Sequence, residues 1–422
     1  MIRGLWEKRF FAYADGHDSI ASQHLMLNRE LFSNAVRARV RCAVSRCVLR
    51  GGAVAFLVCA LAPRGFLRAQ QSNPSQRQQQ NEFQTNAESE LQTGTDLTQH
   101  GKFAAAIPHL VAARRHVANE YAASFNLALC YVATGQPKLA VPIVQELQKQ
   151  NSGAAAVWNL SAQAYVGDGQ PDKAFEALQH AARITPGDAR LYSYVADACT
   201  AARNDALGLK VVDLGLQNVP HSARLHYERA VFLTALDRFD EAKQDFRLAS
   251  DLGRDTDIGY LAAVHESLIA GDLPETIRVA RQAIGKGQDD YILLSLYAEA
   301  LFRSGAYPGS DSLAEAEHAA EKSVAERPDY PSSRITLGKL YRIDHRLDDS
   351  IEQLEAARKL DPRNPAIYSN LATAFRLKGD RAKAHQALAV LESLNQQQVI
   401  AIRDSGTKTG ERHGNVSTVR NQ

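Results

Sequence analysis

Histidine pairs are the residues of this chain whose spacing comes nearest to that of a metal site. His109 and His116 are seven residues apart, and His221 and His226 are five apart. Two histidines that bind zinc from one helix usually lie four residues apart, because they then face the same side. The observed spacing indicates solvated surface histidines, and we expect no metal-binding residues.

Acidic pairs and short catalytic motifs are the other places to look for chemistry. Asp289–Asp290 and Asp348–Asp349 fall near expected helix starts, where carboxylates stabilise the helix dipole. The body of the sequence has no Gly-rich phosphate loop, no His-Glu-x-x-His pair and no Gly-x-Ser-x-Gly turn. We therefore predict no catalytic residues, no cofactor and no enzyme activity.

The five cysteines do not form a framework either. Cys42, Cys47 and Cys59 lie in the first 69 residues, which leaves Cys130 and Cys199 for the body. Two cysteines without metal-like spacing make neither a zinc site nor a disulfide framework. We expect both to be small buried apolar side chains.

The beginning of the chain has the pattern of a targeting signal. Five arginines between residues 37 and 50 precede an apolar stretch at 51–62, which is too short to span a membrane as a helix. We predict a leader with a signal peptide over residues 1–69, cleaved near Ala69–Gln70, with Met26 as an alternative start. The mature protein would be exported, periplasmic or secreted, without a stable membrane span; an uncleaved N-terminal membrane anchor is the alternative.

Charge and composition separate this leader from the rest. Residues 1–69 contain 11 basic and 4 acidic residues, and the remainder contains 38 basic and 43 acidic ones. The body is therefore slightly acidic, and we expect no nucleic-acid partner. Residues 70–86 are rich in glutamine and are predicted to be a flexible linker, and residues 399–422 a disordered tail.

A period of 34 residues runs through 87–398. Its units begin at Ala87, Tyr121, Ala155, Ala189, Ala223, Asp257, Tyr291, Pro331 and Pro365, with an insertion of six residues in the seventh unit. With the first residue of each unit as position 1, position 8 is Gly or Ala in eight of nine units, and position 20 is always small. Small side chains at two fixed positions predict that two helices approach closely in every unit.

Glycine and proline mark the ends of these helices. Position 15 is glycine in six units, and position 32 is proline in four, as Pro186, Pro220, Pro328 and Pro362. Glycine allows the turn where the first helix stops, and proline ends the second helix. A single helical hairpin leaves its apolar face in water, so neighbouring units must stack to bury it.

The pattern resembles the tetratricopeptide repeat family. In the third unit, Trp158, Ala162, Ala174 and Pro186 occupy positions 4, 8, 20 and 32, where the family has a large residue, two small residues and a proline, and Gly169 occupies position 15. The resemblance covers about three quarters of the chain. It implies an all-α fold, an α-solenoid superhelix of about nine tandem antiparallel helix pairs.

The resemblance also implies a concave surface lined by positions 2, 5, 9, 12 and 13 of the first helices. The residues carried over to it are Phe125, Leu129, Val132, Tyr227, Val231, Leu261, Leu268, Arg303, Lys339, Arg342 and Arg376, with Glu299 as the one acid among the basic residues. These residues suit a peptide with an apolar stretch and an acidic end. The alternative is that the apolar residues are inter-repeat packing and the basic ones a solvated face.

Some family members hold a terminal carboxylate with lysine and asparagine residues. Lys339 and Thr373 stand here where that asparagine is expected, which puts this activity in doubt. The sequence therefore predicts an exported scaffold or adaptor that binds a protein or peptide partner in its concave groove. The alternative is a structural, self-associating module of the cell envelope.

Overall fold

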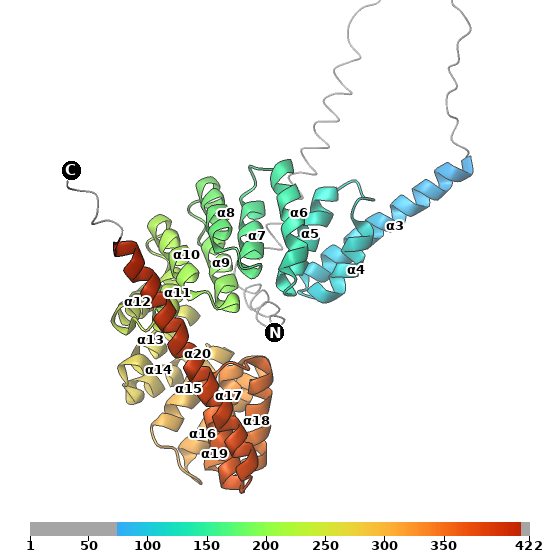
Figure 1. Cartoon of the computed structure of the whole chain (residues 1–422). Helices are drawn as coiled ribbons and strands as arrows, with labels where there is room; N and C mark the ends of the chain where they lie inside the picture. Colours follow the sequence, from blue (N-terminus) through green and yellow to red (C-terminus); the bar gives the residue numbers. More distant parts are fainter. Residues whose placement is uncertain (1–73, 415–422) are drawn as a thin grey trace, which may run out of the picture. The chain divides into compact units, whose positions relative to one another are not determined.

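The computed structural model describes residues 74–414, and describes side chains for residues 84–397. The predicted leader, with its signal peptide, its start at Met26 and its cleavage near Ala69, lies outside the described residues. Within them, all regular structure is α-helical, in 18 helices from α3 to α20, and no strand occurs (Figure 1). The prediction of an all-α solenoid of helix pairs is confirmed.

The chain divides into two compact units on either side of Gln150. The described part of the N-terminal unit holds α3 (Pro74–Gln99), α4 (Phe103–Ala113), α5 (Glu120–Ala133) and α6 (Pro137–Gln150). The C-terminal unit holds α7 (Ala155–Gly167), α8 (Pro171–Ile184), α9 (Ala189–Ala202), α10 (Asp205–Asn218), α11 (Ala223–Ala235), α12 (Phe239–Leu252), α13 (Asp257–Ala270), α14 (Leu273–Gly285), α15 (Tyr291–Arg303), α16 (Asp311–Glu326), α17 (Pro331–Ile343), α18 (Leu347–Leu360), α19 (Pro365–Lys378) and α20 (Arg381–Gly414).

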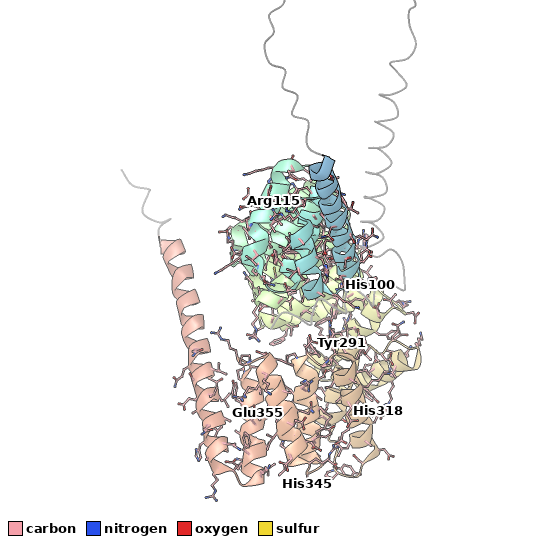
Figure 2. All side chains as sticks on the ribbon, turned by 90° about the vertical axis from the view of Figure 1, so that its right-hand side faces the viewer. His100, Arg115, Tyr291, His318, His345 and Glu355 are labelled. Atoms are coloured by element: carbon pink, nitrogen blue, oxygen red, sulfur yellow. The ribbon has the colours of Figure 1, made fainter. Side chains whose placement is uncertain are left out.

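The helices of the C-terminal unit follow the 34-residue register. The odd-numbered helices α7 to α19 are the first helices of seven repeats, and each begins at the first residue of a predicted repeat. Each packs against the even-numbered helix that follows it. In Figure 2, Tyr291 at the start of α15 and His345 after the end of α17 lie at opposite edges of the helices, because successive first helices run in the same direction. The insertion lengthens the turn between α15 and α16, as expected.

The turn at position 15 has one backbone conformation throughout. All nine residues at this position have a positive φ, between 54° and 96°. Six are glycines, but Arg203, Asp237 and His345 adopt the same left-handed conformation with a side chain. That conformation costs a non-glycine residue about 1–2 kcal/mol. The geometry of the hairpin is therefore kept in three repeats against local strain.

Close approach at positions 8 and 20 holds each hairpin together. In the eighth repeat, a Cβ atom added to Gly338 on α17 would lie 2.7 Å from Leu354 Cγ on α18. The hydroxyl of Ser350, at position 20, donates to the carbonyl of Gly338 at 2.6 Å. Both Ser350 and Leu354 are fully buried. The small residues thus let the two backbones approach until side-chain and backbone atoms touch.

A second contact joins each repeat to the one before it. In five repeats, the side chain at position 4 donates a hydrogen bond to the backbone carbonyl at position 32 of the preceding repeat, and the distances are 2.7–3.0 Å. The pairs are Trp158–Ser152, Tyr192–Pro186, His226–Pro220, Arg334–Pro328 and Tyr368–Pro362. In these five repeats, the polar group at position 4 fixes the link that follows the second helix of the preceding repeat.

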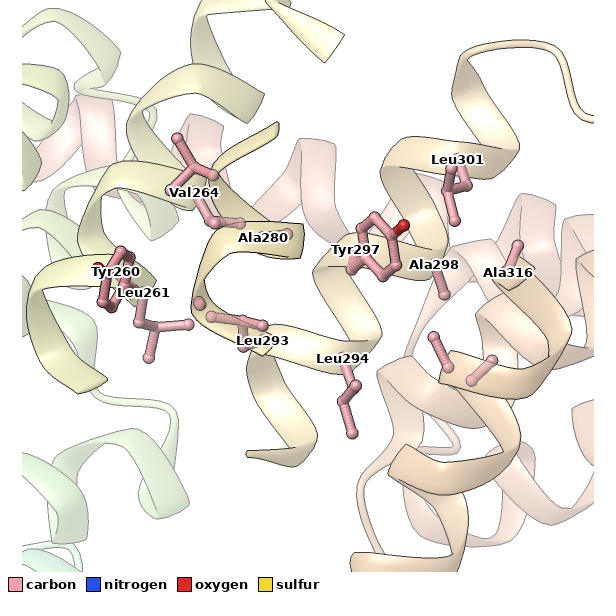
Figure 3. Close-up of a cluster of buried hydrophobic side chains, with 14 of the residues drawn as sticks. Tyr260, Leu261, Val264, Ala280, Leu293, Leu294, Tyr297, Ala298, Leu301 and Ala316 are labelled. Carbon is pink, nitrogen blue, oxygen red and sulfur yellow. The ribbon is translucent and has the colours of Figure 1, made fainter. Parts of the chain in front are cut away.

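A buried cluster of apolar side chains shows how stacking completes the core. It runs without a break from α11 to α17 and includes Leu261, Leu293, Tyr297 and Leu301 (Figure 3). Side chains of one hairpin fill the space between the helices of the next. Burying this apolar surface at roughly 25 cal/mol per Å² is the main stabilising term for the array.

The two segments flanking the repeats differ from expectation. Helix α3 begins at Pro74, within the predicted linker, and α20 continues to Gly414, within the predicted tail. These segments have few apolar residues, but the Gln, Glu, Lys and Arg that they contain have a high helix propensity. Once a packed turn has nucleated a helix, each further residue adds a hydrogen bond at little cost.

Gly338→Ala should destabilise the protein by a net of about 1–2 kcal/mol. Overpacking against Leu354 costs about 1–3 kcal/mol, which outweighs a gain of about 1 kcal/mol in helix propensity. Gly285, at the exposed end of α14, has no atom within 4 Å of an added Cβ, and Gly285→Ala should stabilise slightly. Urea unfolding followed by circular dichroism compares the two. An equal effect of both changes would contradict the close approach.

Candidate functional site on the first helices

The candidate site is the set of side chains at positions 2, 5, 9, 12 and 13 of the first helices, called here the inner face. In the C-terminal unit it is carried by α7, α9, α11, α13, α15, α17 and α19, each of which contacts the next along the chain. The repeat register thus brings residues that are 34 or more positions apart onto neighbouring helices. In the N-terminal unit, the helix with predicted inner-face residues is α5.

On α5, two of the three predicted residues are part of the core. Phe125 and Val132 are 7% and 8% exposed, and Leu129 is half-buried. Phe125 also stacks on Tyr121 one turn earlier, with ring centroids 6.3 Å apart. In this unit, Phe125 and Val132 pack inside the protein and are not open to a ligand.

The predicted apolar residues of the C-terminal unit also divide into buried and half-buried ones. Tyr227 on α11 and Leu261 on α13 are buried in the large core cluster, and Val231 packs against its edge. Val231 and Leu268 are half-buried. For Tyr227 and Leu261, the structure favours packing between repeats over an exposed apolar groove.

Among the basic residues, Lys339 has its charge compensated. Its Nζ lies 3.1 and 3.0 Å from the two carboxylate oxygens of Glu299 on α15, which also accepts from Thr336. The ammonium group lies 5.4 Å from the centroid of the Phe302 ring. Lys339 therefore joins α17 to α15 and offers little free charge.

Arg342 is in the opposite situation. It lies one turn after Lys339 on α17, is half-buried, and its Nε is buried without a hydrogen-bond partner among the described residues. Burial lowers its pKa, and no neighbouring carboxylate opposes that effect. Arg303, at the end of α15, and Arg376, on α19, are exposed. A half-buried guanidinium without an acidic partner is the feature of this surface that most requires explanation.

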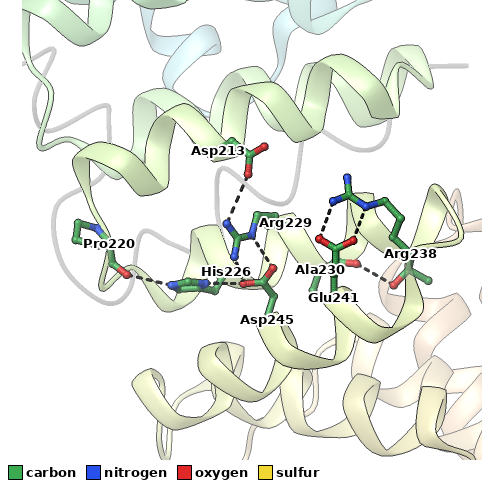
Figure 4. A network of polar contacts seen from close by, with 9 residues as sticks. Asp213, Pro220, His226, Arg229, Ala230, Arg238, Glu241 and Asp245 are labelled. Carbon is green, nitrogen blue, oxygen red and sulfur yellow. Dashed lines mark hydrogen bonds and ion pairs between the residues drawn. The ribbon is translucent and has the colours of Figure 1, made fainter. Parts of the chain in front are cut away.

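A buried polar network lies away from the inner face, between α10, α11 and α12 (Figure 4). Asp245 is 2% exposed and accepts from Arg229 at 2.6 and 2.7 Å, while His226 Nδ1 lies 2.8 Å from it. Burial raises the pKa of Asp245, but the bonds from His226 and Arg229 outweigh it and hold the pKa below its usual value.

This network corrects one expectation. His226 is buried, so its prediction as a solvated surface histidine is wrong. At position 4 it takes the role of the tyrosines in other repeats, because its Nε2 lies 3.0 Å from the carbonyl oxygen of Pro220. Arg229 also pairs with Asp213 on α10. The arrangement links two hairpins and is structural.

The two cysteines and the acidic pairs that the sequence offers for chemistry also have structural roles. Cys130 and Cys199 are buried free thiols, as expected, and burial raises the pKa of each to about 12. Asp290 caps α15 by accepting from two backbone N–H groups, and Asp348 and Asp349 lie in the first turn of α18.

Among the described residues, no three His, Cys, Asp or Glu side chains are placed to hold a metal. In the same part of the chain, no helix is both apolar and long enough to cross a membrane.

Comparison with models of known protein families identifies the class of helical repeat. Profiles of the tetratricopeptide repeat match residues 97–164, 155–188 and 335–397. The match at 155–188 has the same bounds as the third repeat predicted from the sequence. The protein belongs to the tetratricopeptide repeat family.

Three solved structures are similar to this chain at low sequence identity. The APC/C hetero-tetramer Cut9–Hcn1 is 14% identical, with 78% of this chain and 68% of that chain covered and a TM-score of 0.47. A tetratricopeptide repeat protein from Parabacteroides merdae is 18% identical, with 69% and 99% covered and a TM-score of 0.43. Human IFIT1, a dimer with PPP-AAAA, is 17% identical, with 63% and 66% covered and a TM-score of 0.46. Among curated proteins, no relative matches this chain. The tetratricopeptide repeat fold is in general that of a protein-interaction scaffold.

Proposed function

We propose that this tetratricopeptide repeat protein is an exported scaffold whose inner face binds a peptide segment of a protein partner. The acidic end of that segment lies against α15, α17 and α19. The basic pattern of the leader supports export, and the family supports the role of scaffold. No step of this function needs a catalytic residue or a cofactor.

The observation that carries the proposal is Arg342. Taking a charged group out of water costs free energy unless the group is paired, and proteins seldom bury arginine without a partner. A carboxylate of the partner can bind this guanidinium through two parallel hydrogen bonds. The exposed Arg303 and Arg376 add positive charge on the neighbouring helices α15 and α19.

The apolar part of the surface is smaller than the sequence suggests. Val231 and Leu268 keep partial exposure on α11 and α13, whereas Tyr227 and Leu261 are in the core. Most of the specificity should therefore come from charged and polar contacts.

A second candidate function is self-association. Leu377 at the end of α19 and Leu388 on α20 are 55% and 47% exposed, and both belong to the last hairpin. Exposed apolar residues on a terminal repeat favour contact with another copy of the chain. Sedimentation velocity over a range of protein concentrations distinguishes this role, because a monomer at all concentrations would speak against it.

Arg342→Glu combined with Arg376→Glu should weaken binding of an acidic peptide at least about tenfold. A hydrogen bond to a charged group contributes about 1.5–3 kcal/mol, and an exposed pair contributes about 0–1 kcal/mol. The ligand is a fluorescein-labelled peptide with a leucine-rich middle and a run of glutamates at one end. Fluorescence anisotropy at low and high salt measures the affinity and its salt dependence.

The matched control is Arg358→Glu with Lys359→Glu on α18. Both residues are exposed on a second helix, and the change in net charge is the same. This control should bind the peptide nearly as well as the wild type. Equal weakening by the two variants would show that net charge alone attracts the peptide, and the proposal would fail.

Export predicts a processed N-terminus near Gln70. N-terminal sequencing of the protein recovered from the cell envelope measures it. Leu57→Arg, which interrupts the apolar stretch of the leader, should leave unprocessed protein in the cytosol. Wild-type protein found in the cytosol with Met1 or Met26 intact would contradict export.

A further inference from the structure

Two polar side chains on the inner face of α7 form a hydrogen-bonded chain of fixed orientation with the backbone of α9. Asn159 on α7 donates through Nδ2 to the backbone carbonyl of Leu191 on α9, at 2.6 Å. A backbone carbonyl can only accept, so this bond determines which end of the Asn159 amide is oxygen. Its Oδ1 then accepts from Gln163 Nε2 at 2.7 Å.

This chain leaves one acceptor without a donor. Because Gln163 Nε2 faces Asn159, the Oε1 of Gln163 must point away from it. Gln163 is 5% exposed, and its Oε1 is buried with no hydrogen-bond partner among the described residues. A buried acceptor without a donor costs free energy, and a bound group that donates would remove this cost.

Glu228 on α11 presents a second acceptor of the same kind. It is 8% exposed, and Arg224 Nε donates to its Oε1 at 2.7 Å. Its Oε2 is buried and has no partner in the described part of the chain. Burial raises the pKa of Glu228, and Arg224 and Ser193 oppose that effect while Asp197 adds to it.

The two acceptors lie on helices that share a neighbour. Helix α9 contacts both α7 and α11 (Figure 1), and Asp197 on α9 is close enough to act on the carboxyl group of Glu228. Asp197 stands at position 9, as Gln163 does on α7. Both groups without a donor are thus oxygen acceptors, and Glu228 has a further carboxylate near it. This stretch of the first helices therefore favours a ligand that carries donors and positive charge.

We propose that Gln163 Oε1 and Glu228 Oε2 accept hydrogen bonds from lysine or arginine side chains of the bound peptide. This inference rests on the proposed function, because the same peptide places its acidic end on α17 and α19. Lysine and arginine carry donors only, and a charged donor bonds more strongly than a backbone amide. The peptide is then basic toward α7–α11 and acidic toward α17–α19.

Selection from a random peptide library displayed on phage, with the full chain immobilised, tests the inference. The selected peptides should be enriched in lysine and arginine at least about threefold over the unselected library, because charge-assisted hydrogen bonds are roughly twice as strong as neutral ones. They should also be enriched in glutamate and aspartate. No enrichment in basic residues would overturn the inference.

Variants separate the two subsites. Glu228→Gln with Gln163→Leu turns one acceptor into a donor and removes the other, and it should abolish the basic enrichment while the acidic enrichment remains. Glu315→Gln on α16, which accepts from Arg281 and Tyr297 in the wild type, is the matched control and should keep both. Basic enrichment that persists in the double variant would overturn the inference.

The charge-reversed variant Arg342→Glu with Arg376→Glu tests the other end. It should lose the acidic enrichment and keep the basic one. Acidic enrichment missing from the wild type would count against the proposed function alone, and recovery of no peptides at all would count against both. Circular dichroism and thermal unfolding confirm that each variant keeps its helices.

Discussion

The close approach of two helices in every repeat is the constraint on which the rest of this structure depends. Small residues at positions 8 and 20 bring the helix backbones together, to the point that an atom added at Gly338 would overlap Leu354. With that distance fixed, each hairpin has one shape, and the next hairpin can stack on it in one way. The hydrogen bond from position 4 to position 32 then fixes the link between them in five repeats.

Because stacking is set by these few positions, the inner face is free to vary. It carries the buried acceptor of Gln163 on α7 and the unpaired Nε of Arg342 on α17, and Glu228 on α11, at the adjacent position 6, has a further acceptor without a partner among the described residues. None of the three belongs to positions 8 or 20, so none is required for the approach of the helices. Polar groups that are buried and unpaired lower stability, which makes them the natural places for a ligand to bind.

Much of the fold follows from the sequence, since the 34-residue period gives the start of each first helix from Ala155 to Pro365. The positive φ of Arg203 and His345 is not predictable in the same way, because glycine is the residue that most strongly indicates a positive φ in a sequence. The burial of His226 was missed because its partner Asp245 lies 19 residues away on the next helix. For the inner face, the register gives the direction of a side chain but not its neighbours. Lys339 and Arg342 therefore look alike in the sequence, although one is paired and the other is not.

Photo-crosslinking compares a position on the inner face with a position on a second helix. It tests most directly whether the inner face is the binding surface. Benzoyl-phenylalanine replaces Thr373, at position 9 on α19, or Glu352, exposed on the second helix α18, and the full chain is irradiated in cells. We predict that the inner-face position attaches the chain to another protein and that the Glu352 position does not. Attachment through Glu352 with none through Thr373 would contradict the account.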